Sequence, residues 1–326
     1  MRPLSLRAEV AKQLMAGAAG VLAGENPLRR IRKALRLLSA PSEGPAAGDR
    51  GVLEAGFRVV RLAPIETARP LCLLVTYAPD GRPFPHTLRL CGDLRRAGLT
   101  LILIVATDRP DLDCLDPGPD VVDGLVVRAN EGYDFAAWAA TLRHIPEAWD
   151  AAELWFANDS VYHSAPALAE LLQRARQSPA AAVALTGSTQ IAPHFQSYFF
   201  LLKPAALTRA PVREFWWGVR AHADKNAVIR AYEVGQKAML EAAGVEVDIL
   251  FPASAGGAEN QLQTGWRALL DEGFPFVKIE LLRDNPHGAD LTGWRDLLAA
   301  RGFSVEDIAF HLGARADGAA ALLALK

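Results

Sequence analysis

Three polar residues that follow an apolar run form the strongest chemical signal in the sequence. The run at 153–157 (ELWFA) leads directly into Asn158, Asp159 and Ser160. We expect a buried strand whose end presents one carboxylate between an amide and a hydroxyl. In open α/β sheets, ligands bind outside the carboxyl ends of the strands. Oxygen ligands there suit Mg²⁺ or Mn²⁺, and such a cation suits a diphosphate. The alternative is a turn formed by the Asp-Ser pair.

A second polar group follows the apolar segment at 121–127. Residues 128–135 read RANEGYDF, and Asn, Gly and Asp are residues that turn a chain and present side chains at a strand end. We expect Asn130 and Asp134 to hydrogen-bond a nucleotide or a sugar. The alternative for Asp134 is the N-cap of the helix that follows it.

A third group, at 194–198 (HFQSY), lies just before another predicted strand. Its polar side chains are suited to face a donor or an acceptor, and we place His194, Gln196 and Ser197 in the candidate site. A histidine titrates near neutral pH and can act as a general base. The alternative for His194 is a hydrogen bond that orders a loop.

The elements that must position these groups alternate along the chain. Apolar runs predict strands at 71–77, 99–107, 121–127, 153–158, 181–186 and 197–202, and helical patterns lie at 86–98, 135–144 and 166–178. Helices dominate from Pro211 onward, at 211–221, 226–243, 262–272 and 291–301. Continuous apolar strands between helices are typical of an α/β fold with a mostly parallel sheet covered on both faces.

Familiar catalytic fingerprints are missing from the sequence. No G-x-G-x-x-G follows the first predicted strand, where Tyr77-Ala78-Pro79-Asp80-Gly81 stands instead. The P-loop, G-x-S-x-G and H-E-x-x-H patterns do not occur either. We therefore expect a nucleotide-binding type of sheet without the dinucleotide motif, with Tyr77 and Asp80 as further candidates for donor contact.

Composition limits the class of protein. The chain has 326 residues, a formal net charge of −2 and 51% hydrophobic residues, which suits one large domain with appendages. This charge gives no basis for nucleic acid as a partner. The three cysteines have no metal-type spacing and fit a reducing compartment, so we expect a cytoplasmic protein.

Residues 1–66 form a separate N-terminal arm and linker in our prediction. On a helix over 27–38, four apolar residues would share one face among five basic residues. One interpretation is peripheral contact with the inner membrane surface. The other is an amphipathic arm that packs on the body of the protein or on a partner.

Short segments in a fixed order resemble the rhamnan synthesis protein F family over about residues 70–300. They are 130–135 (NEGYDF), 158–162 (NDSVY), 187–189 (GST), 194–199 (HFQSYF), 215–216 (FW), 232–235 (YEVG), 274–278 (FPFVK) and 283–286 (RDNP). The family comprises glycosyltransferases of bacterial polysaccharide assembly, typically rhamnosyltransferases with a GT-A-like nucleotide-binding sheet. The resemblance therefore implies a GT-A-like domain over 67–326 with a helical C-terminal part.

The resemblance also implies a position for the diphosphate. Asn158-Asp159-Ser160 stands where GT-A enzymes place the D-x-D that holds Mg²⁺ or Mn²⁺, although here only Asp159 is acidic. We assign Asp159 as the metal ligand. The expected nucleotide-sugar contacts are Tyr77, Asp80, Asn130, Gly132, Asp134, Asn158, Asp159, Ser160, Gln196 and Ser197.

An inverting transfer needs a group that takes the proton from the acceptor hydroxyl. We assign Glu233 first to this role, followed by Asp134 and His194, and the alternative for Glu233 is an ion pair with a neighbouring Arg or Lys. Lys278 and Arg283 are assigned either to phosphate or a lipid-linked acceptor, or to a solvated basic edge.

The expected function is transfer of L-rhamnose from dTDP-L-rhamnose to a growing cell-surface polysaccharide. The partners would be the nucleotide-sugar and a glycan or lipid-linked acceptor. Trp216 and Trp217 are candidates for stacking on a sugar, or for the core. A different class of function stays open: a non-catalytic nucleotide- or glycan-binding subunit, or a scaffold for assembly enzymes.

Overall fold

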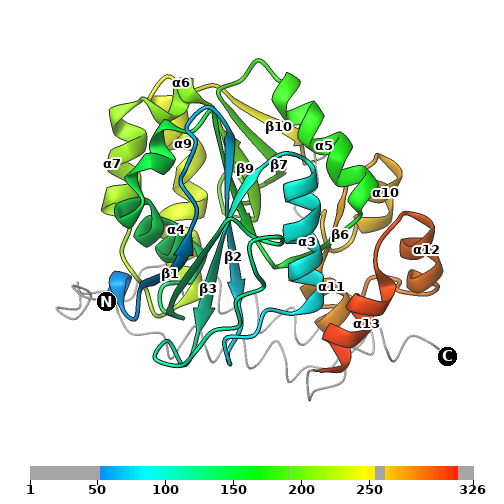
Figure 1. Cartoon of the computed structure of the whole chain (residues 1–326). Helices are drawn as coiled ribbons and strands as arrows, with labels where there is room; N and C mark the ends of the chain where they lie inside the picture. Colours follow the sequence, from blue (N-terminus) through cyan, green and yellow to red (C-terminus); the bar gives the residue numbers. More distant parts are fainter. Residues whose placement is uncertain (1–51, 190, 254–260, 315–326) are drawn as a thin grey trace, which may run out of the picture. The chain divides into compact units, whose positions relative to one another are not determined.

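A nine-stranded sheet runs through the part of the chain that the computed structural model describes, which is residues 52–189, 191–253 and 261–314. The strand order is β1-β4-β3-β2-β5-β9-β7-β10, and β8 pairs with β7 (Figure 1). The strands are β1 (Arg58–Leu62), β2 (Pro70–Tyr77), β3 (Thr100–Thr107), β4 (Gly124–Ala129), β5 (Glu153–Asn158), β7 (Ala182–Ser188), β8 (His194–Phe195), β9 (Phe199–Leu202) and β10 (Val247–Phe251).

Six of the nine strands in this sheet run in the same direction. β4, β3, β2 and β5 run in one direction, and β10 is parallel to β7. β9 lies between β5 and β7 and is antiparallel to both, and β1 is antiparallel to β4. The predicted α/β class with a mostly parallel sheet is therefore confirmed.

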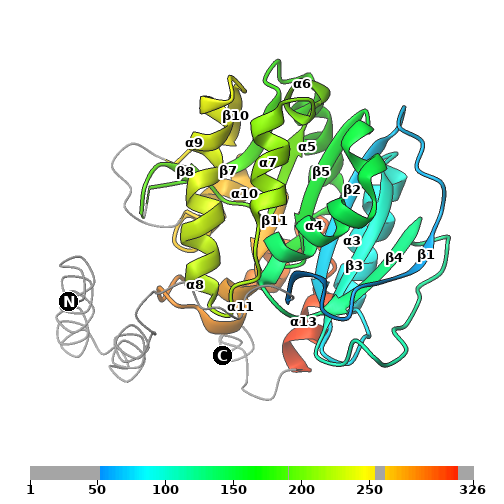
Figure 2. The same cartoon turned by 90° about the vertical axis from the view of Figure 1, so that its left-hand side faces the viewer.

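Helices cover both faces of the sheet, with α3 and α5 on one side and α4, α7 and α9 on the other (Figures 1 and 2). Successive residues of β2 show the reason. Leu71, Leu73 and Val75 enter the core that contains α4, whereas Cys72 and Leu74 enter the core that contains α3 and α5. Side chains alternate between the faces of a strand, so a strand covered on both faces must be apolar throughout.

The helices largely match their predicted positions. Those that cover the sheet are α3 (Pro85–Arg96), α4 (Tyr133–His144), α5 (Ala165–Gln177), α6 (Pro204–Leu207), α7 (Ala210–Gly218), α8 (Lys225–Val228) and α9 (Val234–Ala242). The helix predicted over 226–243 consists of α8 and α9, joined by a π-helical segment at Ile229–Glu233. Among the described residues, α9 is therefore not a regular continuation of α8.

The region after Pro211 contains more than helices. β10 lies beside β7 in the main sheet, and a separate two-stranded sheet pairs β11 (Phe276–Lys278) with β6 (Val161–His163). The helices there are α10 (Trp266–Asp271), α11 (Ile279–Asp284), α12 (Trp294–Ala300) and α13 (Val305–Gly313). These elements share a core of their own, built around Trp266, Trp294 and Leu298.

The predicted arm boundary at residue 66 is wrong. Residues 58–62 form β1, which pairs with β4 and belongs to the sheet. The sequence signal was weak because Val59 and Val60 are exposed on this outer strand, so the strand lacks a continuous buried run. The segment 27–38 lies outside the described residues. The chain divides into two units, Met1–Gly48 and Asp49–Lys326.

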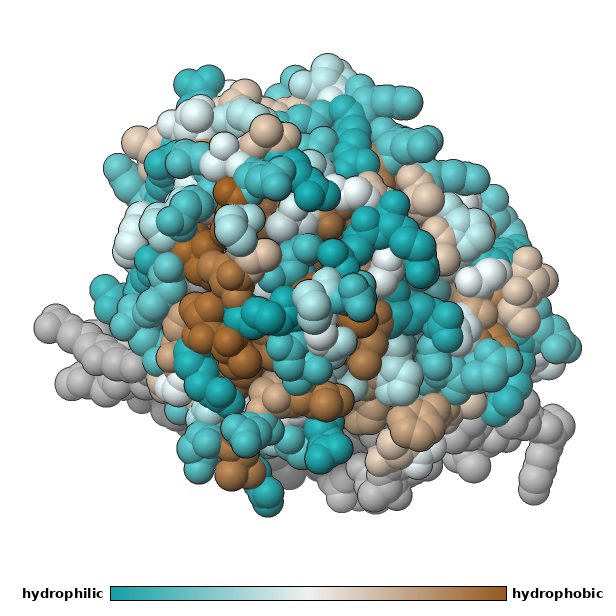
Figure 3. Space-filling view, viewed as in Figure 1, coloured by the Kyte–Doolittle hydropathy of each residue, from teal (hydrophilic) through white to brown (hydrophobic). Residues whose placement is uncertain are grey.

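The surface near β1 is partly apolar. Val59, Val60 and Leu62 are each more than a third exposed, and Figure 3 shows hydrophobic surface over the side of the sheet where β1 lies. β1 contains two charged residues, Arg58 and Arg61, among its apolar ones. Its register with β4 shifts between Val59 and Arg61. Charge and irregular register on an outer strand discourage pairing with other chains.

The structure also bears on membrane spanning. Over the residues described, no helix combines the length and the apolar character needed to cross a bilayer.

Candidate functional site

The site lies where the strand order reverses. From β2 the chain continues to β3 and β4 on one side, whereas β5 pairs with the other side of β2. The carboxyl ends of β2 and β5 therefore form a topological switch point, the usual position of ligands in such sheets. Asp159 follows β5 there, and its backbone N–H donates to the carbonyl oxygen of Val75 in β2. The predicted location of Asp159 at a strand end is confirmed.

The Asp159 carboxylate is tied to the end of β2. Its Oδ2 atom accepts hydrogen bonds from Thr76 Oγ1 at 2.5 Å and from the Tyr77 backbone N–H at 3.2 Å. Burial raises the pKa of Asp159 to about 7, and the negative charge of Asp134 adds to this rise. The two hydrogen bonds oppose the shift because they stabilise the ionised form.

Asn158 links the two predicted polar groups. Its Nδ2 donates to Asp134 Oδ2 at 2.7 Å, and its Oδ1 accepts from Ser160 Oγ at 2.6 Å and from the Ser160 N–H at 3.1 Å. Asn158 is itself buried, so these bonds fix its amide. The structure thus brings Asp134, from the turn after β4, to the end of β5.

Asp134 is not the N-cap of α4. Gly132 occupies that position, and Asp134 lies in the first turn with its carboxylate directed to Asn158. Burial raises the pKa of Asp134, an effect opposed first by the positive charge of Lys225 at the start of α8. The Asp134 carboxylate therefore bonds Asn158, a residue distant in the sequence, and does not cap its own helix.

Gly132 shapes the turn before α4 through its backbone conformation. Its φ is +74°, and a Cβ there would lie 2.5 Å from Ala221 Cα and 2.6 Å from Ala136 Cβ. The next residue, Tyr133, also has a positive φ of 58°, which is rare for a residue with a side chain. This tight turn carries the chain from β4 into α4 and so positions Asp134.

Glu233 ends the π-helical segment and faces the third predicted group. Its Oε2 accepts from Ser197 Oγ at 2.5 Å and from the Ser197 N–H at 3.0 Å. His194 Nε2 lies 3.9 Å from Glu233 Oε1. The other ring nitrogen, Nδ1, bonds the carbonyl oxygen of Ala192 at 2.7 Å, so it carries the proton and Nε2 faces the carboxylate.

Lys278 is brought into the site by β11. Its Nζ donates to Ser160 Oγ at 3.0 Å and lies 4.3 Å from the centroid of the Tyr198 ring. Burial lowers the pKa of Lys278 to about 8, against the opposing negative charge of Glu233. Lys278 is therefore no solvated edge residue. Arg283 instead pairs with its neighbour Asp284 at 2.7 Å.

A side of the site near β3 contains a residue that sequence reasoning missed. Asp108 follows β3 and accepts hydrogen bonds from the Tyr77 hydroxyl at 2.7 Å and from Asn130 Nδ2 at 3.4 Å. The sequence pattern that indicated Asp159 was present here too, because Asp108 also follows directly after an apolar strand. Asp108 thereby brings Tyr77 and Asn130 together.

Other predicted residues have structural partners. Gln196 accepts a hydrogen bond from Thr186 Oγ1 at 2.9 Å, inside the sheet beside Ser197. Asp80 accepts from the backbone N–H of Arg82 at 3.1 Å, which closes a local turn. Trp216 is buried in the core against Phe156, and Trp217 is 55% exposed.

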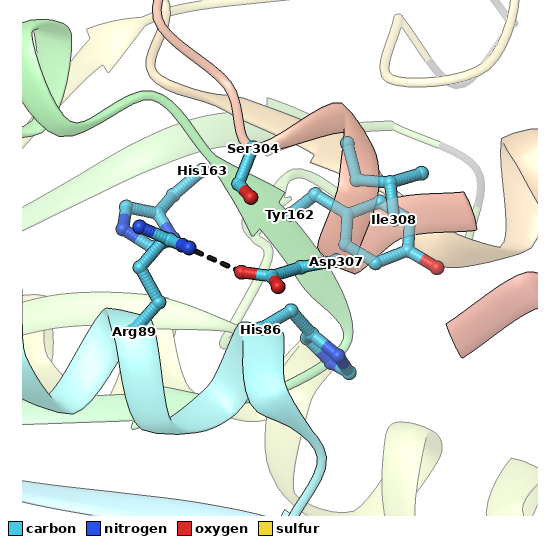
Figure 4. A pocket seen from close by; sticks show the side chains of 7 residues that line it. All are labelled: His86, Arg89, Tyr162, His163, Ser304, Asp307 and Ile308. Carbon is cyan, nitrogen blue, oxygen red and sulfur yellow. Dashed lines mark hydrogen bonds and ion pairs between the residues drawn. The ribbon is translucent and has the colours of Figure 1, made fainter. Parts of the chain in front are cut away.

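A separate polar pocket lies between α3, β6 and α13 (Figure 4). It is lined by His86, Arg89, Tyr162, His163, Ser304, Asp307 and Ile308. Arg89 Nε and Asp307 Oδ2 are 2.5 Å apart, which joins α13 to α3. This pocket contains none of the predicted site residues.

The oxygen atoms at the strand end suit a divalent cation poorly. Oδ2 of Asp159 and Oδ1 of Asn158 each accept two hydrogen bonds, and Ser160 Oγ both donates to Asn158 and accepts from Lys278. Mg²⁺ is usually held by one or two carboxylates together with water and phosphate oxygens. Asp159 Oδ1 is the remaining carboxylate oxygen of the triplet. The described ranges contain no group of three or more His, Cys, Asp or Glu suited to a metal.

Comparison with known proteins gives a distant similarity. A search against models of protein families found no match. The chain is similar to virulence protein VirA of Vibrio anguillarum, from strain ATCC 68554 / 775 and from the species without a stated strain. In both cases it is 26% identical over 202 residues, which cover 51% of this chain and 64% of VirA. The chain thus spans less than two thirds of the length of this relative.

Proposed function

We propose that the protein is a glycosyltransferase that moves a sugar from a nucleotide-sugar to a glycan of the bacterial cell surface. The observation that carries the proposal is the group of charged side chains at the switch point of the sheet. Asp134, Asp159, Glu233 and Lys278 influence one another there electrostatically. Charged groups that shift one another's pKa at a strand edge are typical of catalytic sites.

The strand order distinguishes the main sheet from the doubly wound dinucleotide sheet. Counted from β2 along the main path, the order is 3-2-1-4-6-5-7, and only the sixth strand is reversed. The doubly wound dinucleotide sheet has the order 3-2-1-4-5-6 instead. The two orders differ in the second half, where this sheet has an inserted reversed strand.

In the proposed complex the nucleoside lies over the ends of β2, β3 and β4. Tyr77 is 37% exposed, so its ring can stack on a base. Asp108 and Asn130 offer an acceptor and an amide to base or ribose groups. The diphosphate would then lie toward Ser160 and Lys278.

The proposed chemistry is a single displacement with inversion. The acceptor hydroxyl oxygen attacks the anomeric carbon, and the bond from that carbon to the diphosphate oxygen breaks. Glu233 takes the hydroxyl proton, since Ser197 holds one carboxylate oxygen and leaves Oε1 for the proton. The electron pair of the broken bond leaves with the nucleoside diphosphate. By the family resemblance, the donor is dTDP-L-rhamnose and the acceptor is a glycan or lipid-linked glycan.

A donor screen tests this function. The full chain is incubated with a panel of nucleotide-sugars and a lipid-linked glycan acceptor, and release of nucleoside diphosphate is measured. We expect turnover with dTDP-L-rhamnose and none with the Asp159→Ala variant. Binding of donors without turnover would instead identify a nucleotide-binding subunit. Full activity of Asp159→Ala would overturn the site.

A further inference from the structure

Lys278 occupies a position where its charge can serve the diphosphate. β11 pairs antiparallel with β6, and this register places Lys278 opposite Val161, the residue after Ser160. The N–H of Ile279 donates to the Ser160 carbonyl oxygen at 3.0 Å and fixes the backbone on the other side of Lys278. The lysine is thus attached to the Asn158-Asp159-Ser160 triplet by main-chain pairing.

The ammonium group is fixed as well as the backbone. It lies 3.0 Å from Ser160 Oγ and 4.3 Å from the centroid of the Tyr198 ring, in a cation–π contact. A lysine has three N–H donors. The bond to Ser160 uses one of them, so further donors are available for phosphate oxygens.

The same contact competes with a metal at this position. Ser160 Oγ would be a neutral oxygen ligand beside Asp159, but it already accepts a hydrogen bond from a cation. A divalent ion next to that ammonium group would meet like-charge repulsion. The local carboxylates Glu233 and Asp134 oppose the lowering of the Lys278 pKa by burial and so favour its charged form.

We propose that the Lys278 ammonium group, in place of a divalent metal ion, neutralises the diphosphate of the donor during transfer. The inference rests on the proposed function and deepens it, because it specifies that transfer does not require a metal ion. As the bond from the anomeric carbon to the diphosphate oxygen breaks, the leaving group gains one negative charge. Lys278 keeps its proton and donates a hydrogen bond to the oxygen that gains this charge.

The test is calorimetric titration of the full chain with dTDP, UDP and GDP, each in EDTA and in Mg²⁺ or Mn²⁺. We expect at least one of them to bind with the same affinity in all buffers. Lys278→Met, which removes the charge, should weaken binding about tenfold to a hundredfold, the range for one charge-assisted hydrogen bond. Metal should not restore this loss, and Lys278→Arg should keep most of the affinity.

A matched control is Lys237→Met, because Lys237 pairs with Glu241 on the surface of α9 and lies outside the site. Binding that requires Mg²⁺ or Mn²⁺, or unchanged binding by Lys278→Met, overturns the role of Lys278 while the proposed function stands. Failure of the wild-type chain to bind any of the three nucleotides overturns both. Where a variant does not fold, nucleotide binding by the wild-type chain in EDTA and in Mg²⁺ or Mn²⁺ still decides whether binding requires a metal ion.

Discussion

Asp159 is held in surroundings that disfavour its charge. It is partly buried beside Asp134, and its pKa is raised to about 7 despite hydrogen bonds from Thr76 and Tyr77. A carboxyl group with a raised pKa favours folding most at low pH, where the group is protonated in both states. That contribution is lost as the pH rises through 7. The residue thus reduces stability at neutral pH, as functional groups often do.

Replacing Asp159 with Asn should therefore stabilise the protein. A pKa shift from 3.8 to about 7 corresponds to about 4 kcal/mol above pH 7, and the amide oxygen can still accept from Thr76. We expect Asp159→Asn to exceed the wild type in free energy of unfolding, by more at pH 8 than at pH 5. Urea denaturation at both pH values measures this. A variant less stable than the wild type at pH 8 would show that the ionised carboxylate is favoured in the folded protein.

Replacing Glu233 with Gln should remove the proposed base and leave the position of the side chain intact. The amide oxygen can still accept from Ser197, so donor binding should not change. We expect the rate of transfer to fall about 10²- to 10⁴-fold, the usual contribution of a general base. Steady-state rates and calorimetric binding of dTDP measure the two effects separately. Glu241→Gln, which affects a surface ion pair, should behave as the wild type. Normal turnover by Glu233→Gln would assign the base elsewhere.

At the scale of elements, irregular backbone positions two of the side chains that we propose as catalytic. The π-helical segment Ile229–Glu233 interrupts the helix at the point where Glu233 meets Ser197. Such segments often occur at functional sites. The turn of Gly132 and Tyr133 performs the same task for Asp134. Both features use backbone geometry that a regular helix could not provide.

The turn can be tested with two glycines of similar conformation. Gly132 and Gly244 have φ of +74° and +72°, but only Gly132 has atoms within 4 Å of the position of a Cβ. Gly244→Ala should cost only the left-handed backbone term of about 1–2 kcal/mol. Gly132→Ala should cost about 1–3 kcal/mol more, because the methyl group meets Ala221. Urea denaturation compares the two, and equal losses would contradict the close packing. Only Gly132→Ala should weaken dTDP binding.

At the scale of the whole molecule, one sheet carries the candidate site and a small C-terminal sheet completes it. β11 belongs to that second sheet, and through its pairing with β6 it delivers Lys278 to the end of β5. The C-terminal part is therefore required for the site as well as for packing. The basic segment 27–38 remains a proposal for contact with the inner membrane surface.

Membrane contact can be measured by flotation of the full chain with anionic and neutral liposomes. Five basic residues and an apolar helical face predict binding to the anionic vesicles only. Deletion of 27–38 should abolish it. Deletion of 40–51, an equally long segment rich in small residues, should leave it unchanged. Flotation that survives the loss of 27–38 would remove this segment from that role.

The sequence by itself determined the class of fold and the edge at which the site lies. Strands buried on both faces must be apolar along their length, and polar residues directly after them mark the ends of those strands. This local information was enough to place Asp159, Asn130 and Asp134 at one edge. It was not enough for β1 and β10, where partial exposure weakened the apolar signal.

Only the tertiary structure decided which charged groups meet. Ser197 lies 36 residues before Glu233, and Ser160 lies 118 before Lys278, so no periodicity along the chain relates them. Their contact depends on the pairing of β11 with β6 and on the π-helical segment before α9. Long-range pairing of this kind is set by the packing of the whole domain, and it brings the Lys278 ammonium group to Ser160.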